Sequence, residues 1–125
     1  MPILWQANRG VLTRTESTEQ SAVISWARWN ENAQPELRWL FSSLNGVRLH
    51  PAVAAKMKRE GMTRGIPDLC LPVARQGYNC LWVEMKRQGG KVRPEQAEFL
   101  DFVTGQGHLA TVCVGADDAI ETIKW

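Results

Sequence analysis

The sequence predicts an α/β fold in which helices flank a mixed sheet of about four strands. Segments with the repeat of amphipathic helices alternate with short apolar segments typical of strands, and glycine or proline separates most of them. The 44% apolar and 22% charged residues are typical of a globular protein rather than of a disordered or membrane chain. At 125 residues we expect one domain over residues 1–125, with residues 1–15 as an irregular lead-in.

The first two elements are predicted from capping and from alternation. Ser17 and Gln20 have the spacing of a capping box, and the apolar residues that follow repeat at helical intervals. They predict a helix from Thr18 to Glu31. In residues 37–41, leucine, tryptophan and phenylalanine alternate with other residues, which predicts a strand that ends at a turn over residues 45–46.

The rest of the chain continues this alternation. The predicted elements are a basic helix over residues 52–60 with Gly61 as its stop, strands over 68–71 and 79–86 that form a hairpin, a helix from Pro94 to residues 105–107, a strand over 109–114, and a helix over 116–125. The segment 109–114 is almost wholly apolar, so we expect it to be a central, buried strand.

The cysteines, the tryptophans and the lengths of the apolar runs predict where these residues lie and whether the chain contacts a membrane. Cys70, Cys80 and Cys113 lie in apolar segments, form no CxxC pair and have no zinc-like spacing to histidine, so we expect buried free thiols in a reducing cytoplasm. Most of the six tryptophans are expected in the core or at an interface. No run approaches the roughly 18 apolar residues of a membrane span, so we expect no membrane contact.

Charge is unevenly distributed along the chain. The net charge of +2 is too small to indicate nucleic-acid binding, but residues 56–93 carry nine Lys and Arg against three Asp and Glu. A basic segment set against an acidic remainder is what a phosphate-binding face requires. A solvated helix with basic loops would have the same composition, so charge alone leaves both interpretations open.

Three charged residues interrupt the apolar strands of the predicted hairpin. Asp68 begins one strand, and Glu84 and Lys86 end the next on a shared face, because side chains alternate along a strand. Asp68 can then lie beside Glu84, where two carboxylates repel each other unless a cation lies between them. Oxygen ligands of this kind suit Mg²⁺ or Mn²⁺. Lys86 could orient or deprotonate a water molecule and offset charge on an attacked phosphate.

An isolated Glu-x-Lys is more often a surface ion pair across or along strands than a catalytic site. Two features reverse that preference: Pro67-Asp68 stands at a matching distance on the preceding strand, and a helix follows. We therefore interpret Asp68, Glu84 and Lys86 as a candidate active site.

These motifs resemble those of the PD-(D/E)XK nucleases, and more narrowly the VRR-NUC (virus-type replication-repair nuclease) domain in its minimal stand-alone form. The resemblance covers roughly residues 16–123, and the matching segments are Glu19-Gln20, residues 37–41 leading to Asn45-Gly46, residues 65–69, residues 84–86, and Pro94-Glu95-Gln96. It implies a restriction-endonuclease-like αβββαβ core. Proline at position 94 departs from the serine often found there, which affects the helix cap and not the chemistry.

The resemblance also implies roles for individual residues. Lys86 would be the catalytic lysine, Asp68 and Glu84 would be metal ligands, and the carbonyl of Met85 would be a further ligand to Mg²⁺ or Mn²⁺. Glu19 would be an acidic residue of the first helix that faces the site and reaches the metal through water. Its alternative role is a first-turn carboxylate that favours the helix dipole.

Gln96 and the basic residues around the motif complete the predicted site. Gln96 would contact substrate or a water near the site, and an ordinary place in the first turn of a helix is equally compatible with its position. The residues expected to contact DNA phosphates are Lys56, Lys58, Arg59, Arg64, Arg87, Lys91 and Arg93.

No segment resembles a recognition helix for base edges, so we expect recognition of DNA shape. Minimal family members resemble Holliday-junction resolvases in size, and the approximate two-fold symmetry of a junction would call for a homodimer. The predicted function is a metal-dependent endonuclease for branched DNA, without organic cofactor, in a bacterial or phage-infected cell. The alternative is a non-catalytic junction-binding module or accessory subunit. A sequence-specific restriction-like enzyme is disfavoured by the short chain.

Overall fold

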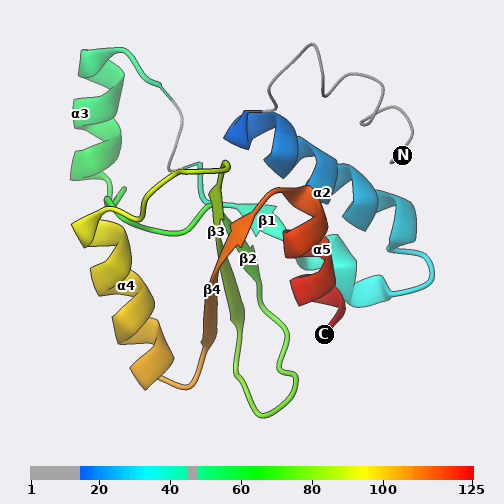
Figure 1. The fold of residues 1–125 in the computed structure, drawn as a ribbon. Coiled ribbons are helices and arrows are strands. Elements are labelled where there is room, and N and C mark those ends of the chain that lie inside the picture. The colour runs from blue at the N-terminus through cyan, green and yellow to red at the C-terminus, as the bar shows by residue number, and fades with distance from the viewer. Residues whose placement is uncertain (1–14, 45–47) are drawn as a thin grey trace.

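The computed structural model describes residues 15–44 and 48–125. The elements in chain order are α2 (Glu16–Asn30), the 3-10 helix η1 (Pro35–Trp39), β1 (Phe41–Ser42), α3 (Pro51–Arg59), β2 (Leu69–Leu71), β3 (Leu81–Lys86), α4 (Pro94–Gly105), β4 (Leu109–Val114) and α5 (Ala116–Lys124). The predicted α/β class with a mixed four-stranded sheet is confirmed (Figure 1). The predicted lead-in over residues 1–14 and the turn over 45–46 lie outside the described residues.

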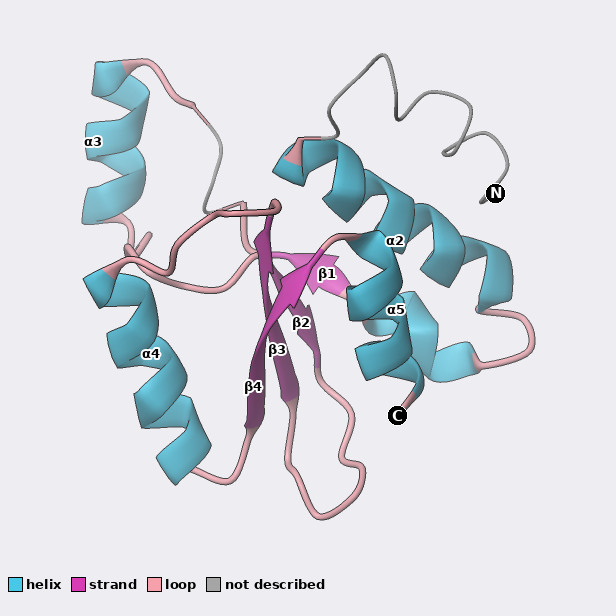
Figure 2. Ribbon diagram, viewed as in Figure 1, coloured by secondary structure: helices cyan, strands magenta, loops and turns pink. Residues whose placement is uncertain are grey.

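The sheet has the strand order β1-β2-β3-β4 (Figure 2). β1 pairs with β2 and β2 with β3 in antiparallel fashion, whereas β3 and β4 are parallel. The prediction that residues 109–114 form the central strand is wrong, because β4 lies at the edge. Val112 and Val114 remain 36% and 46% exposed. An apolar run indicates a strand with both faces partly covered, and it does not say how many neighbouring strands pair with it.

Helices cover the two faces of the sheet unequally. α2 and α5 lie side by side against one face, and α4 lies against the other (Figure 1). The alternation in β3 follows this division: Leu81, Val83 and Met85 belong to the core under α2 and α5. On the opposite face, the ring of Trp82 meets Phe99 of α4 edge-on, with 5.2 Å between centroids. The face that carries Glu84 and Lys86 is therefore the one beneath α4.

The first helix begins earlier than predicted. Thr15 is its N-cap, and the Thr15 Oγ1 accepts a hydrogen bond from the Thr18 amide at 3.1 Å. Ser17 therefore lies inside the first turn and does not cap it. The side chain of Gln20 donates to Ser42 Oγ at 3.1 Å instead of closing a capping box. The helix therefore begins about two residues earlier than predicted. The acidic residues of its first turn occupy helix positions, relative to the sheet, that differ from the predicted ones.

The predicted strand over residues 37–41 is wrong for most of its length. Residues 35–39 form η1, and only Phe41 and Ser42 pair with β2. Leu37 and Leu40 are buried, whereas Trp39 is 59% exposed. A spacing of three residues between buried positions fits a 3-10 helix, in which positions i and i+3 lie on the same side. The apparent alternation counted Trp39 as a core residue, which it is not.

Cysteine and tryptophan differ in how well they follow expectation. All three cysteines are free thiols, and Cys70 and Cys113 are buried, while Cys80 is partly exposed with its Sγ 3.3 Å from that of Cys70. Among the described tryptophans none is fully buried and Trp29 is 86% exposed, although Trp26 packs against the core. Placement in the core is therefore wrong for most of them, and placement at an interface stays a prediction. In the described part of the chain, no helix has both the length and the apolar character needed to cross a bilayer.

Candidate active site

A polar cavity of about 250 Å³ lies where β2 begins, β3 ends and α4 begins. Its lining combines three carboxylates, three cationic side chains and one amide with a single aliphatic residue: Glu16, Ile66, Asp68, Glu84, Lys86, Lys91, Arg93 and Gln96. Among the residues predicted for catalysis, the cavity brings together Asp68, Glu84, Lys86 and Gln96. Glu19 is not part of it.

Asp68 stands directly before β2 and is held by the neighbouring strand. Its Oδ2 accepts a hydrogen bond from the Met85 backbone N–H at 2.7 Å. The antiparallel register pairs Leu69 with Val83, which places Asp68 opposite the end of β3 that carries Glu84. Pro67 before it is fully buried and fixes the backbone at the entry to the strand. The two carboxylates therefore face one cavity from adjacent strands, as the hairpin predicts.

Glu84 and Lys86 are buried charges, with 3% and 7% of their surfaces exposed. Lys86 Nζ lies 3.6 Å from Glu84 Oε2, but Glu84 Oε1 has no hydrogen-bond partner in the described structure. Burial is the main cause that raises the pKa of Glu84 to about 8; the nearby Asp68 acts in the same direction, and Lys86 opposes them. A carboxylate that is buried, next to another carboxylate and only half satisfied is costly unless a cation joins it.

Gln96 connects the lysine to the glutamate. Its Oε1 accepts hydrogen bonds from Lys86 Nζ at 3.0 Å and from the Arg93 backbone N–H at 2.9 Å. Its Nε2 donates to Glu84 Oε2 at 3.3 Å. Gln96 is thus both a capping residue of α4 and a link between Lys86 and Glu84. The prediction of a contact with substrate or water remains a prediction, and the direct contact with two site residues was not foreseen.

The donor set fits a hard divalent cation. Asp68 and Glu84 offer carboxylate oxygens, and the unpartnered Glu84 Oε1 faces no competing donor in the described structure. Within residues 15–44 and 48–125, no three His, Cys, Asp or Glu side chains converge closely enough to form a ligand group by themselves. Backbone carbonyl and water oxygens would have to complete the coordination, which is usual for Mg²⁺. The prediction of the Met85 carbonyl as a ligand is compatible with this requirement.

The helix-borne carboxylate that lines the cavity is Glu16, and not Glu19 as predicted. Glu19 is 8% exposed, and its Oε2 accepts a hydrogen bond from the Ala116 N–H at 2.5 Å, at the N-terminus of α5. Glu16 lies one turn earlier and lines the cavity, with its Oε2 3.4 Å from the Arg87 backbone nitrogen. Recognising Thr15 as the N-cap would have placed Glu16 at the helix start, nearest the strand ends.

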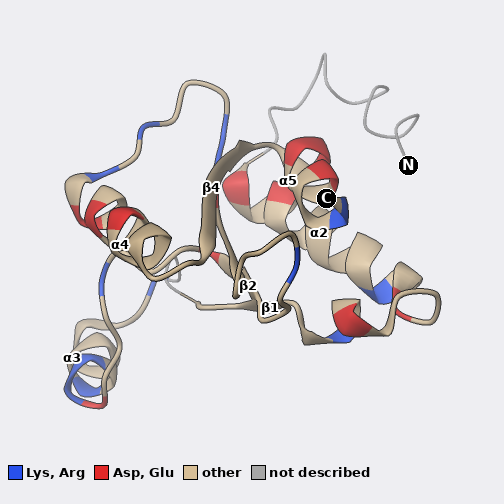
Figure 3. Cartoon of the chain, turned by 90° about the horizontal axis from the view of Figure 1, so that it is seen from below, with Lys and Arg blue, Asp and Glu red and all other residues tan. Residues whose placement is uncertain are grey.

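The basic residues form two groups instead of one face. Lys56, Lys58 and Arg59 lie on α3, a helix without a single buried residue, while the other group follows β3 in the loop over residues 87–93. Figure 3 shows these two groups on opposite sides of α4. Arg64 and Arg93 are each ion-paired with Glu95 on the first turn of α4. Lys91 and Arg93 line the cavity itself.

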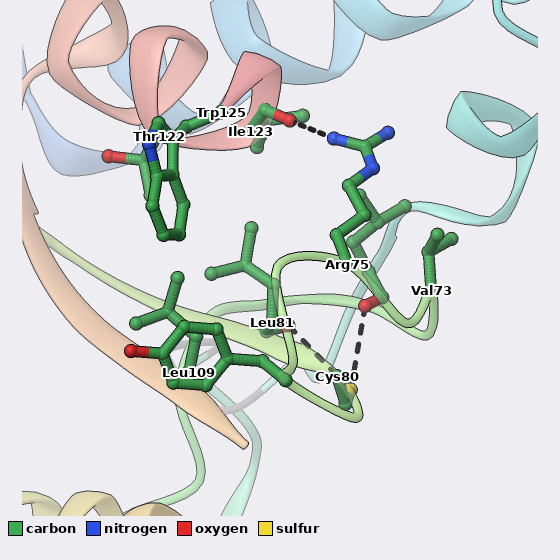
Figure 4. A pocket seen from close by; sticks show the side chains of 10 residues that line it. Val73, Arg75, Cys80, Leu81, Leu109, Thr122, Ile123 and Trp125 are labelled. Carbon is green, nitrogen blue, oxygen red and sulfur yellow. Dashed lines mark hydrogen bonds between the residues drawn. The ribbon is translucent and has the colours of Figure 1, made fainter. Parts of the chain in front are cut away.

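A second cavity lies between the β2–β3 hairpin and α5 (Figure 4). It encloses about 20 Å³, which is room for one water molecule. Leu81, Leu109 and Ile123 dominate its walls, and Arg75 bridges it by donating to the Ile123 carbonyl. Arg75 also forms an ion pair with Glu36 at 3.0 Å, so its charge is already used to fasten the hairpin to η1 and α5. This cavity offers no cluster of reactive groups.

Comparisons with known proteins agree with the fold and with the resemblance to the VRR-NUC family. The sequence model of the VRR-NUC domain family matches residues 13–117 of this chain. A solved structure described as "VRR_NUC domain protein" is similar with a TM-score of 0.73 and 30% sequence identity, over 90% of this chain and 88% of that chain. A comparison with curated proteins finds no match. The chain belongs to the VRR-NUC domain family and has its nuclease-type fold.

Proposed function

We propose that this protein is a metal-dependent endonuclease that hydrolyses phosphodiester bonds in branched or structured DNA. One observation carries the proposal: Asp68, Glu84 and Lys86 meet in a single polar cavity, and Glu84 Oε1 is buried there without a hydrogen-bond partner in the described structure. A module that only bound DNA would gain nothing from carboxylates facing phosphates, because like charges repel.

Asp68 and Glu84 would hold Mg²⁺ or Mn²⁺, together with the Met85 carbonyl, and Glu16 lies at the cavity wall to contribute through water. When bound, the ion supplies positive charge that polarises the phosphate and makes an attacking water more acidic. Lys86 Nζ would donate to the water or to a phosphate oxygen and offset the negative charge that develops during attack. Gln96 holds the ammonium of Lys86 in place for this task at 3.0 Å.

Two further parts of the proposal concern the substrate and the assembly. The basic groups on α3 and in the loop over residues 87–93 would contact phosphates without reading sequence, which suits recognition of DNA shape. A homodimer would relate two active sites by a two-fold axis, which matches the approximate two-fold symmetry of a junction. The exposed apolar side chains of Phe102, Val112 and Val114, on α4 and the edge strand, support a contact between copies. The mass measured by light scattering at micromolar concentration tests this. The mass of a monomer would contradict the dimer.

The decisive experiment is cleavage of labelled four-way junction, flap, nicked and linear duplex DNA. Each substrate is tested in Mg²⁺, Mn²⁺ and EDTA, with Lys86→Ala as the site variant. Lys124→Ala is the matched control, because Lys124 is a half-exposed lysine on α5 that pairs with Glu121 outside the cavity. We expect metal-dependent cutting by the wild type and Lys124→Ala, and a loss of at least about 100-fold in Lys86→Ala.

Each outcome separates the candidate functions. Equal cutting by Lys86→Ala and Lys124→Ala would remove Lys86 from the mechanism. Tight binding of the junction with no cutting in either metal would favour the non-catalytic junction-binding module. Preference for the junction over linear duplex would support branched DNA as the substrate, and equal cutting of all four substrates would contradict it.

A further inference from the structure

Glu95, on the first turn of α4, joins two arginines from different segments of the chain. Its Oε1 lies 3.2 Å from Arg64 Nη2 and 3.4 Å from Arg93 Nε. Arg64 precedes the loop that leads to Asp68, and Arg93 is the N-cap of α4 and lines the cavity. One carboxylate oxygen is thus paired with two arginine side chains at the border of the candidate active site.

The backbone places Arg64 at this position. Gly65 has a φ of +86°, which favours glycine, and a Cβ built on it would collide with the backbone carbonyl of Glu95. The segment that carries Arg64 therefore packs directly against the turn that carries Glu95. The meeting of Arg64 with Glu95 follows from this backbone contact and not only from the orientation of two long side chains.

The pair of arginines has the chemistry of a phosphate site. A guanidinium matches the geometry of a phosphate as well as that of a carboxylate. Two guanidinium groups together can bind the two non-bridging oxygens of one phosphodiester. Both arginine side chains are accessible, with 76% and 63% of their surfaces exposed, whereas Glu95 is 29% exposed. A hydrogen bond with its own backbone, and then the two arginines, hold the pKa of Glu95 below its usual range, so its carboxylate is charged.

We propose that Arg64 and Arg93 form a binding subsite for a DNA phosphate next to the one that enters the cavity, and that Glu95 occupies this subsite in the DNA-free protein. Exposed ion pairs are weak, so an incoming phosphate can displace the carboxylate. Glu95 then lowers the affinity for DNA, because its charge must leave the arginines before they bind. This inference rests on the proposed function, since it assumes DNA as the ligand.

The test measures binding of a fluorescent duplex oligonucleotide in Ca²⁺, over a range of salt concentrations, by anisotropy. Glu95→Gln should tighten binding roughly two- to fivefold, the effect expected when the weak exposed ion pairs of Glu95 with Arg64 and Arg93 are removed. The double variant Arg64→Gln, Arg93→Gln should weaken binding and reduce the slope of log K against log salt by about 0.9 for each phosphate that is no longer neutralised. In that double background, Glu95→Gln should have no further effect, because no arginines remain to be released.

Glu98→Gln is the matched control, since it removes the same charge one turn further along α4 from an exposed side chain. Equal tightening by Glu98→Gln, or by Glu95→Gln in the double-arginine background, would show a general effect of charge and overturn the inference. Weaker binding by Glu95→Gln would overturn it too, by showing that Glu95 orients the arginines. If the wild type cuts DNA in Mg²⁺ while the variants overturn the inference in either way, the proposed function stays intact. A wild type that neither binds nor cuts would refute both.

Discussion

Gln96 shows how one side chain can serve the fold and the site together. Its carbonyl oxygen accepts from the Arg93 amide and from Lys86, and its amide nitrogen donates to Glu84. The reverse orientation of the amide would place an NH₂ donor against two other donors, so these contacts allow one orientation. The position of the lysine ammonium in the cavity is therefore coupled to the start of α4.

Replacing Gln96 by methionine tests this coupling. Gln96→Met keeps the length of the side chain but removes both hydrogen bonds to the site and the one to the cap. We expect the single-turnover rate of cleavage to fall about 10- to 100-fold, as when a residue that orients the groups of a metal site is removed. Stability should fall by only about 1 kcal/mol, as when a helix cap is removed. An unchanged rate with the same decrease in stability would limit Gln96 to a role in the fold.

Asp68→Asn tests the metal site without requiring cleavage. A ligand that binds only the folded state at 100 times its Kd stabilises it by about 2.7 kcal/mol, so Mn²⁺ should raise the melting temperature of the wild type. The variant should lose that increase. Without metal it should be at least as stable as the wild type, because its neighbour Glu84 no longer faces a second charge. Asp101→Asn, an exposed position on α4, is the control that should keep the increase.

The residues of the site were predictable to different degrees. Asp68, Glu84 and Lys86 follow from alternation along two neighbouring strands, which is a local pattern. Glu16 was missed because its place depends on the helix start and on the Arg87 amide, 71 residues away in the chain. Helix boundaries are uncertain by one or two residues, and a shift of that size exchanges the residues that face a neighbouring strand.

At the scale of elements, η1 depends on a side chain from another helix. Arg28 of α2 donates to the carbonyls of Leu37, Arg38 and Leu40 at 3.1, 3.2 and 3.0 Å. The Leu37 carbonyl also accepts the Leu40 N–H within this turn, and the one guanidinium supplies donors to all three carbonyls at and just after the end of η1. The turn between α2 and β1 is therefore fixed by an interaction that no local pattern in residues 35–41 reveals.

Arg28→Met should destabilise the protein by about 1.5–3 kcal/mol, the range for hydrogen bonds to a charged group. The aliphatic part of the side chain is kept, so the decrease comes from the guanidinium. Urea denaturation measures it, with Arg38→Met as the control, because Arg38 is exposed and its guanidinium stacks on the neighbouring Trp39. Equal destabilisation in the two variants would contradict a specific role for Arg28. The metal-dependent rise in melting temperature should survive in both.

Most element positions were predictable because their evidence is local. Pro94 marks the start of α4, and the glycines at 61 and 77 mark the end of α3 and the hairpin turn, where both have positive φ. The place of β4 at the sheet edge was not predictable, because pairing partners come from distant parts of the chain. The apolar run over residues 109–114 would look the same with one neighbouring strand or with two.

For the whole molecule, the arrangement of charge matters more than its total. The basic groups on α3 and in the loop over residues 87–93 lie on opposite sides of α4, with the candidate active site at the start of that helix (Figure 3). A net charge of +2 would not hold DNA at physiological salt. Under the proposed function, two separate basic groups would contact one duplex, one from α3 and one from the loop whose Lys91 and Arg93 line the cavity. α3 buries no residue of its own, which leaves its surface available for such an interaction.

The salt dependence of binding tests whether one duplex spans both groups. One variant replaces Lys56, Lys58 and Arg59 by glutamine, and a second replaces Arg87 and Lys91. For a duplex that spans both groups, each variant should reduce the slope of log K against log salt by about 0.9 for every phosphate left without its cation, and the combined variant should show the sum. Circular dichroism checks that α3 stays helical. If only one variant changed the slope, the DNA would lie along one side of α4, and the other group would have no part in holding the substrate over the cavity.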